Sequence, residues 1–192
     1  STLNMRKRFW RPSSGSTSIL KIGTPITLDP ESKYANMGEA LSNAWMMYFD
    51  WLNRERHGLQ VNGTNYSIEL VLLDDMSSAS AVEWATDHLI QREGVDFFLG
   101  PYSSGLTGRM APLVQAAGKV SVAPGASQTS VFQPHGNVFG MLTPNTQFLD
   151  GAMQAVGAAE GNSRKTVMYL AEDISWTRST CSEVPRLAGL NN

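Results

Sequence analysis

Two short runs of small and hydroxyl-bearing residues follow apolar runs near the middle of the chain. The first is Gly-Pro-Tyr-Ser-Ser-Gly at residues 100–105, and the second is Ala-Pro-Gly-Ala-Ser at residues 123–127. Hydroxyls beside the backbone N–H groups of a helix N-terminus attract a carboxylate or another anion. Two ordinary loops between strand and helix would contain similar residues. We favour a ligand site, because the carboxyl ends of adjacent parallel strands meet at one edge of the sheet.

The elements that would position these runs alternate between strand and helix along the chain. We expect strands over residues 19–26, 67–73, 95–99, 120–123, 138–142 and 166–171. We expect helices over residues 36–56, 80–92, 106–117, 146–160 and 176–187. Such alternation implies right-handed crossovers and therefore an α/β fold, in which a parallel sheet has helices on both faces.

Composition restricts the classes of partner. The chain has 192 residues, of which 42% are hydrophobic and 17% are charged, and its net charge is −2. This composition is that of a globular protein with a real core, and its charge gives no basis for a nucleic-acid partner. No apolar stretch approaches the length that spans a bilayer. The single cysteine, Cys181, allows no internal disulfide and leaves the cellular compartment open.

Signals for catalysis are poor. The three histidines, at positions 57, 88 and 135, lack the spacing of metal ligands, and no nucleophile elbow or nucleotide-binding glycine motif is present. We therefore expect no enzyme, no cofactor and no metal. Asp74 and Asp75 stand at a strand end, where they could form an acidic pair in a site. We favour a solvated loop that caps the helix after it.

The expected helix around residues 44–52, Ala-Trp-Met-Met-Tyr-Phe-Asp-Trp-Leu, is apolar on more than one face. The side that can cover the sheet contains Leu41, Trp45, Tyr48 and Leu52. The helix either lies between layers of a larger structure or contacts another protein, since Met and Trp are common in interface cores. The residues through which a homo-oligomer or a protein partner would bind are Trp45, Met46, Met47 and Trp51.

Four blocks of sequence occur in a familiar order. They are Lys-Ile-Gly at residues 21–23, Leu-Leu-Asp-Asp at 72–75, Phe-Leu-Gly-Pro-Tyr-Ser-Ser at 98–104 and Val-Ala-Pro-Gly-Ala-Ser at 122–127. In order and spacing these blocks resemble the type 1 periplasmic-binding-protein superfamily, especially its branched-chain amino-acid-binding proteins and receptor ligand-binding regions. The resemblance covers residues 19–187. It implies two α/β lobes that close on a small ligand through a hinge.

The resemblance also implies roles for individual residues. Ser104 and Ser127 would bond a carboxylate, and the carbonyl of Gly125 would accept from an ammonium group. The other residues expected at the same ligand are Tyr34, Tyr102, Ser103 and, from the second lobe, Trp176. The function implied is that of an extracellular or periplasmic solute-binding module for an amino-acid-like or amide ligand, in transport or receptor signalling. Contact with a membrane would then occur only through a parent protein or a transporter. The alternative is a non-catalytic interaction or oligomerisation protein with a vestigial cleft.

The resemblance divides the chain into three parts. We expect residues 1–18 to form a disordered N-terminal extension and residues 19–142 to form the first ligand-binding lobe. Residues 143–192 would cross the hinge and begin the second lobe. The second lobe would then be incomplete, as expected of a fragment or one piece of a larger receptor.

Overall fold

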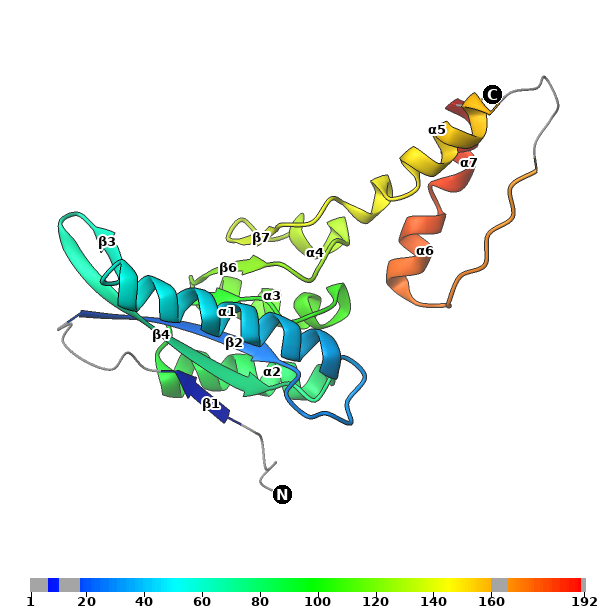
Figure 1. Cartoon of the computed structure of the whole chain (residues 1–192). Coiled ribbons are helices and arrows are strands. Elements are labelled where there is room, and N and C mark those ends of the chain that lie inside the picture. Colours follow the sequence, from blue (N-terminus) through cyan, green and yellow to red (C-terminus); the bar gives the residue numbers. More distant parts are fainter. Residues whose placement is uncertain (1–6, 11–17, 160–165, 191–192) are drawn as a thin grey trace.

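The computed structural model describes residues 7–10, 18–159 and 166–190 (Figure 1). Its strands are β1 (Lys7–Trp10), β2 (Ser18–Ile26), β3 (Leu59–Val61), β4 (Thr64–Asp74), β5 (Phe97–Leu99), β6 (Val120–Ala123) and β7 (Val138–Gly140). Its helices are α1 (Ala35–Glu55), α2 (Ala79–His88), α3 (Ser104–Ala116), α4 (Thr129–Phe132), α5 (Asp150–Ala158), α6 (Ser175–Cys181) and α7 (Val184–Leu190). A π-helical turn, η1 (Leu89–Glu93), extends α2, and a 3-10 turn, η2 (Asn145–Gln147), precedes α5.

The strands of this described part form one sheet in the order β1-β4-β2-β5-β6-β7, and β3 also pairs with β4. Five strands form the parallel part of this sheet, in which each neighbouring pair is parallel: β4 with β2, β2 with β5, β5 with β6 and β6 with β7. The chain starts its parallel sheet at β2 and then adds β4 on one side and β5 on the other. The order of strands therefore reverses between β2 and β5, and in open α/β sheets ligands bind at such a point, outside the carboxyl ends of the strands.

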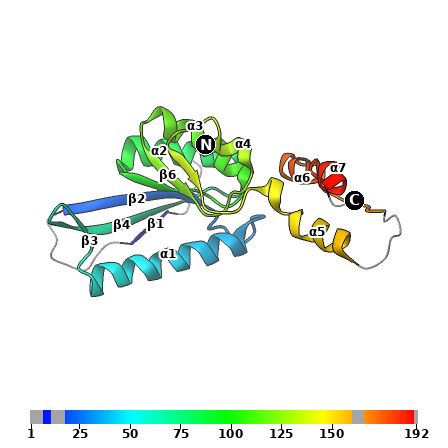
Figure 2. The ribbon, with the colours of Figure 1, turned by 90° about the horizontal axis from the view of Figure 1, so that it is seen from above.

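Helices cover both faces of the sheet, which confirms the expected α/β class. Figure 2 shows α1 on one side and α2, α3 and α4 on the other. Strand β4 contributes to both cores: Ile68, Leu70 and Leu72 pack with the α1 side, whereas Val71 and Leu73 pack with the α2 and α3 side. A strand that is buried on both faces has a continuous apolar sequence, and this explains the apolar run at residues 70–73.

Strand β1 differs from the disordered extension that was expected over residues 1–18, at residues 7–10 alone. Residues 7–10 pair antiparallel with β4, with Arg8 opposite Leu72 and Trp10 opposite Leu70. The outer edge of β4 would otherwise carry unpaired N–H and C=O groups, and β1 satisfies them. The rest of the predicted extension, residues 1–6 and 11–17, lies outside the described residues.

A hairpin that the sequence analysis did not include joins β3 to β4. Its turn is Asn62-Gly63, and both residues have positive φ angles, 47° and 81°. Asn-Gly is the preferred pair for such a two-residue turn, because both positions require the left-handed conformation. The hairpin lengthens β4 at its N-terminal end, away from the carboxyl edge of the sheet.

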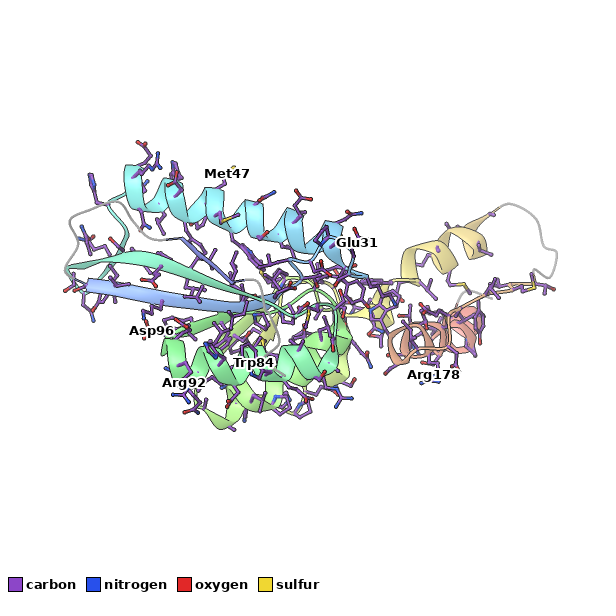
Figure 3. All side chains as sticks on the ribbon, turned by 90° about the horizontal axis from the view of Figure 1, so that it is seen from below. Glu31, Met47, Trp84, Arg92, Asp96 and Arg178 are labelled. Carbon is purple, nitrogen blue, oxygen red and sulfur yellow. The ribbon has the colours of Figure 1, made fainter. Side chains whose placement is uncertain are left out.

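The outward face of α1 differs from the one expected. Trp45 and Met46 were predicted to contact a partner. They instead pack against the core on the α1 side of the sheet. Tyr48, expected to cover the sheet, is instead 53% exposed. Met47 and Trp51 are exposed as expected, and Figure 3 shows Met47 pointing away from the sheet. Successive helical residues are about 100° apart, so a helix that turns positions 45 and 46 inward turns positions 47 and 48 outward.

The part of the chain after β7 forms a small group of helices beside the sheet (Figure 1). The expected helix over residues 146–160 is η2 followed by α5, and the one over residues 176–187 is divided into α6 and α7. Residues 166–171, expected to form a strand, have no strand assignment, and Met168 and Leu170 are almost fully exposed. A strand needs a neighbour for its backbone groups, and the described residues provide none here. No helix among the described residues is long and apolar enough to cross a membrane.

Candidate ligand-binding site

A cavity of about 530 Å³ opens where the loops after β2, β5 and β6 meet α6. The residues that line it are Lys33, Tyr34, Tyr102, Ser103, Ser104, Gly105, Gly125, Ser127, Gln128, Leu142, Phe148, Glu172, Ile174, Ser175 and Trp176. All seven residues predicted to contact a ligand are among them. The structure thus brings these residues together around one space, and their contact with a ligand stays a prediction.

The N-terminus of α3 forms the polar end of the cavity. Ser103 is the N-cap, and its hydroxyl accepts from the backbone N–H of Leu106 at 3.3 Å. The Ser103 backbone has φ 97° and ψ 148°, a combination that is nearly restricted to glycine. The first turn of α3 contains no acidic residue, so the partial positive charge of this helix end is not neutralised by its own side chains. A strained residue at a helix N-terminus is a feature that binding sites share.

Ser104 links the loop after β5 to the loop after β6. Its buried Oγ accepts from the backbone N–H groups of Ser127 and Gln128, each at 3.1 Å. A hydroxyl accepts two hydrogen bonds and donates one. With both acceptor positions filled, the O–H of Ser104 is left to donate, which suits an anionic oxygen in the cavity.

Gly125 lies where even a single added Cβ would be tightly packed. A Cβ added there would be 3.0 Å from the Cα of Tyr102 and 3.3 Å from the carbonyl oxygen of Pro101. The Gly125 carbonyl already accepts from the Ser103 N–H at 3.2 Å. A carbonyl has two lone pairs, so the role predicted for Gly125 requires a second hydrogen bond at the same oxygen.

Trp176 forms the far wall of the cavity. Its indole Nε1 donates to Ser127 Oγ at 2.8 Å, and its ring meets that of Phe148 edge to face at 5.8 Å between centroids. Asn145, which is fully buried, fixes this wall through donation from Nδ2 to the Trp176 carbonyl at 3.2 Å and to Thr180 Oγ1 at 3.0 Å. The aromatic residue expected from the second lobe is therefore held against the first.

Two tyrosines form the near wall. The rings of Tyr34 and Tyr102 meet edge to face at 5.3 Å, and the Lys33 ammonium lies 5.4 Å from the centre of the Tyr34 ring. Together with Phe148 and Trp176, these rings give the cavity four aromatic side chains. The arrangement can hold a small molecule with an anionic end near α3 and a flat apolar body. Among the described residues, no group of three His, Cys, Asp or Glu side chains could hold a metal ion.

The other cavity residues were not predicted from the sequence. Lys33, Gly105 and Gln128 adjoin predicted residues and could have been found as their neighbours, whereas the rest come from the chain after β7. Those are Leu142, Phe148, Glu172, Ile174 and Ser175. They lie outside the four sequence blocks, and only the folding of α6 back onto the first lobe brings most of them to the cavity.

Asp74 and Asp75 do not form the solvated loop that the sequence favoured. Both are buried, at 2% and 0% exposure. Asp75 Oδ1 accepts from Thr27 Oγ1 at 2.6 Å and from the Ser77 N–H at 2.8 Å, and Asp74 Oδ1 accepts from the Leu28 N–H at 2.9 Å. The pKa of Asp75 is raised to about 6, mainly by burial and to a smaller extent by the Asp74 charge, although the hydrogen bonds from Thr27 and Ser77 act in the opposite direction.

Comparison with known proteins agrees with this geometry. The sequence pattern of the family described as "Periplasmic binding protein" matches residues 20–189. A solute-binding protein of an ABC transporter from Rhodopseudomonas palustris BisB5, in complex with 3,4-dihydroxybenzoic acid, has a TM-score of 0.75 at 18% identity. The alignment covers 90% of this chain and 44% of that one.

Two further solved structures are similar. A solute-binding protein from R. palustris in complex with 4-hydroxybenzoate has a TM-score of 0.74 at 20% identity, over 91% of this chain and 45% of that one. LivJ from Streptococcus pneumoniae, in complex with isoleucine, has a TM-score of 0.61 at 20% identity. The alignment covers 71% of this chain and 39% of LivJ. These likenesses show the fold, and this chain spans less than half the length of each structure. No curated protein matches the chain significantly.

Proposed function

This chain belongs to the periplasmic binding protein family, and we propose that it forms the first ligand-gripping lobe, with the beginning of the second, of a solute-binding protein. The proposed boundaries are residues 19–142 for the first lobe and 143–192 for the hinge crossing and the start of the second. Members of this family work in the periplasm or outside the cell. The proposed role is binding without catalysis.

The observation that carries the proposal is the polarity of the cavity. At one end, the Ser104 O–H and the N-terminus of α3 offer donors without a formal positive charge. A carboxylate taken out of water needs several such charge-assisted hydrogen bonds. Along the walls, four aromatic rings and the side chains of Leu142 and Ile174 favour an apolar body. The proposed ligand class is therefore a small carboxylate with an aromatic or aliphatic body.

An amino acid is the narrower version of this ligand. Its ammonium group would need acceptors, for which the chain offers the second lone pair of the Gly125 carbonyl and the carboxylate of Glu172. Similar folds hold 3,4-dihydroxybenzoate, 4-hydroxybenzoate and isoleucine in other proteins. Because those proteins are solute-binding components of transporters, we place this chain in transport ahead of receptor signalling.

A thermal-shift titration with two matched pairs of compounds tests the proposal. The pairs are 4-hydroxybenzoate with 4-hydroxybenzyl alcohol, and isoleucine with isoleucinol, so that each pair differs in the carboxylate. A ligand that binds only the folded state raises the melting temperature in proportion to the logarithm of its concentration. We expect a dose-dependent rise with at least one carboxylate and none with its alcohol. A cooperatively melting protein that responds to neither acid, or equally to acid and alcohol, contradicts the proposal.

A second candidate function is self-association through α1. The exposed positions Met37, Ala44 and Trp51 are spaced seven residues apart, and Met47 is exposed between them. A stripe with this spacing is typical of helices that pair side by side, and we propose a second copy of the chain as its partner. Light scattering of the intact protein tests this candidate. A dimer that Trp51→Ala converts to a monomer supports it, and a monomer at high concentration contradicts it.

A further inference from the structure

Tyr34 is held in the cavity wall by a residue that does not itself line the cavity. The Tyr34 backbone N–H, at the start of α1, donates to Ser77 Oγ at 2.9 Å across 43 residues of sequence. Tyr34 carries one of the two rings of the near wall, against Tyr102 at 5.3 Å. The position of the Tyr34 backbone determines where the Tyr34 ring can lie. The hydrogen bond to the Ser77 hydroxyl therefore helps to position this ring in the cavity wall.

Ser77 is held in turn by an unusual backbone. Met76 and Ser77 have successive positive φ angles of 48° and 53°, in a region that non-glycine residues rarely adopt. Two aspartates support this turn: Asp74 Oδ1 accepts from the Met76 N–H at 2.9 Å, and Asp75 Oδ1 accepts from the Ser77 N–H at 2.8 Å. The turn directs the Ser77 hydroxyl toward α1 at the cost of backbone strain.

Thr27 closes the network from the end of β2. Its Oγ1 donates to Asp75 Oδ1 at 2.6 Å and lies 3.1 Å from Ser77 Oγ. Thr27 and Asp75 are almost completely buried, and the other carboxylate oxygen of Asp75, Oδ2, is buried without a hydrogen-bond partner. A buried carboxylate with one unsatisfied oxygen is costly.

From this geometry we infer that Asp75 and Ser77 are positioning residues for the ligand cavity: they hold Tyr34 in place and so set the affinity for the carboxylate solute. The inference rests on the proposed function for its effect on binding, but the positioning of Tyr34 can be tested without any ligand. Two hydrogen bonds connect these residues: the Ser77 N–H donates to Asp75 Oδ1, and the Tyr34 N–H donates to the Ser77 hydroxyl. Neither Asp75 nor Ser77 lines the cavity.

A double-mutant cycle on the dissociation constant tests the inference, with 4-hydroxybenzoate and isoleucine as the probes. We expect Ser77→Ala to weaken binding about tenfold, the change that corresponds to loss of one hydrogen bond. If Ser77 acts through Tyr34, the same substitution in a Tyr34→Ala background changes affinity less than twofold. The inference is overturned if Ser77→Ala changes the dissociation constant by the same factor in the original protein and in Tyr34→Ala. It is also overturned if Ser77→Ala alone leaves the affinity unchanged. Ser80→Ala, an exposed serine three residues away, is the matched control.

A measurement on the ligand-free protein separates failure of this inference from failure of the proposed function. Tyrosine ring resonances are recorded by NMR for the unaltered protein, Ser77→Ala and Ser80→Ala. We expect the Tyr34 and Tyr102 resonances to shift or broaden in Ser77→Ala only. Resonances that do not move overturn the positioning role, whether or not either probe binds. If Ser77→Ala fails to fold, Ser77→Gly replaces it, because glycine adopts the positive φ without strain.

Discussion

The indole of Trp176 reaches across the cavity to Ser127 and donates to its Oγ at 2.8 Å, although the two residues are 49 positions apart. This hydrogen bond joins α6 to the loop after β6. It also uses one acceptor position of a serine that the sequence predicted to bind a carboxylate. The two sides of the cavity are therefore already linked by the chain's own side chains, and a ligand would meet Ser127 with its O–H and one lone pair remaining.

We expect Trp176→Phe to loosen α6. Phenylalanine keeps an aromatic ring against Phe148 but removes the N–H that donates to Ser127, which would remove about 1 kcal/mol from the attachment of the helix. Amide hydrogen exchange over residues 176–181 should then be several times faster at an unchanged melting temperature. Trp51→Phe, on the exposed face of α1, is the control. Identical exchange in the two variants would mean that the hydrogen bond does not hold α6.

Gly38 and Gly151 provide a matched pair of helical glycines. A Cβ at Gly38 would lie 1.9 Å from the carbonyl oxygen of Thr27, whereas nothing lies within 4 Å of a Cβ at Gly151. We expect Gly38→Ala to lower the free energy of unfolding by about 3 kcal/mol, since α1 must move away from the loop after β2. Gly151→Ala in α5 should raise it by roughly 0.5–1 kcal/mol, because alanine loses less backbone entropy in a helix. Urea unfolding measures both, and a Gly38→Ala protein as stable as the original would refute the close contact.

Ligand binding should depend on Ser104 and Ser127 together. Replacement of both by alanine removes two hydroxyls that can serve a carboxylate, and we expect a loss of roughly 3–6 kcal/mol in binding if the effects add. Calorimetric titration with 4-hydroxybenzoate or isoleucine, whichever binds, measures it. Ser80→Ala, exposed in α2 and outside the cavity lining, is the control. Because Ser104 also accepts from two backbone N–H groups, the variant's melting curve must show a folded protein. Unchanged affinity in a folded double variant contradicts the assignment.

The sequence predicted seven of the residues that line the cavity but not how they bond to one another. Ser104 and Ser127 follow adjacent parallel strands, so their proximity is a property of the fold. That Ser104 accepts from the Ser127 and Gln128 N–H groups depends on side-chain rotamers and loop conformation, which a pattern of residue types does not encode. The role predicted for Gly125 took no account of the Ser103 N–H, which already occupies its carbonyl.

Tertiary contacts account for the expectations that were wrong. An aspartate at a strand end is usually solvated, but the loop after β2 buries Asp75 through Thr27. The apolar pattern at residues 166–171 favours a strand, yet the described residues place no neighbour beside it. In each case the local pattern was compatible with the prediction, and the presence or absence of a neighbouring segment among the described residues decided the outcome.

Asp75 should make stability depend on pH in an unusual direction. Its pKa is about 6 in the folded protein, against an ordinary value of 3.8, because burial disfavours the charged form. Between these two values the folded state keeps a proton that the unfolded chain has lost. The contribution of this group to stability is therefore full below pH 4, falls as pH rises from about 4 to 6, and is constant above that window. The whole change is about 3 kcal/mol, at 1.36 kcal/mol for each unit of pKa.

Asp75→Asn isolates this contribution. Asparagine keeps an oxygen that can accept from Thr27 and Ser77 but cannot ionise. Urea unfolding from pH 4 to 7.5 gives the free energy of unfolding of the variant minus that of the original protein. We expect this difference to rise by about 3 kcal/mol between pH 4 and 6 and then to level off. Asp87→Asn, which removes an exposed carboxylate from α2, is the control for the effect of losing one surface charge on the free energy of unfolding. A difference for Asp75→Asn that stays constant or falls over this range would mean that the carboxyl of Asp75 is not desolvated in the folded protein.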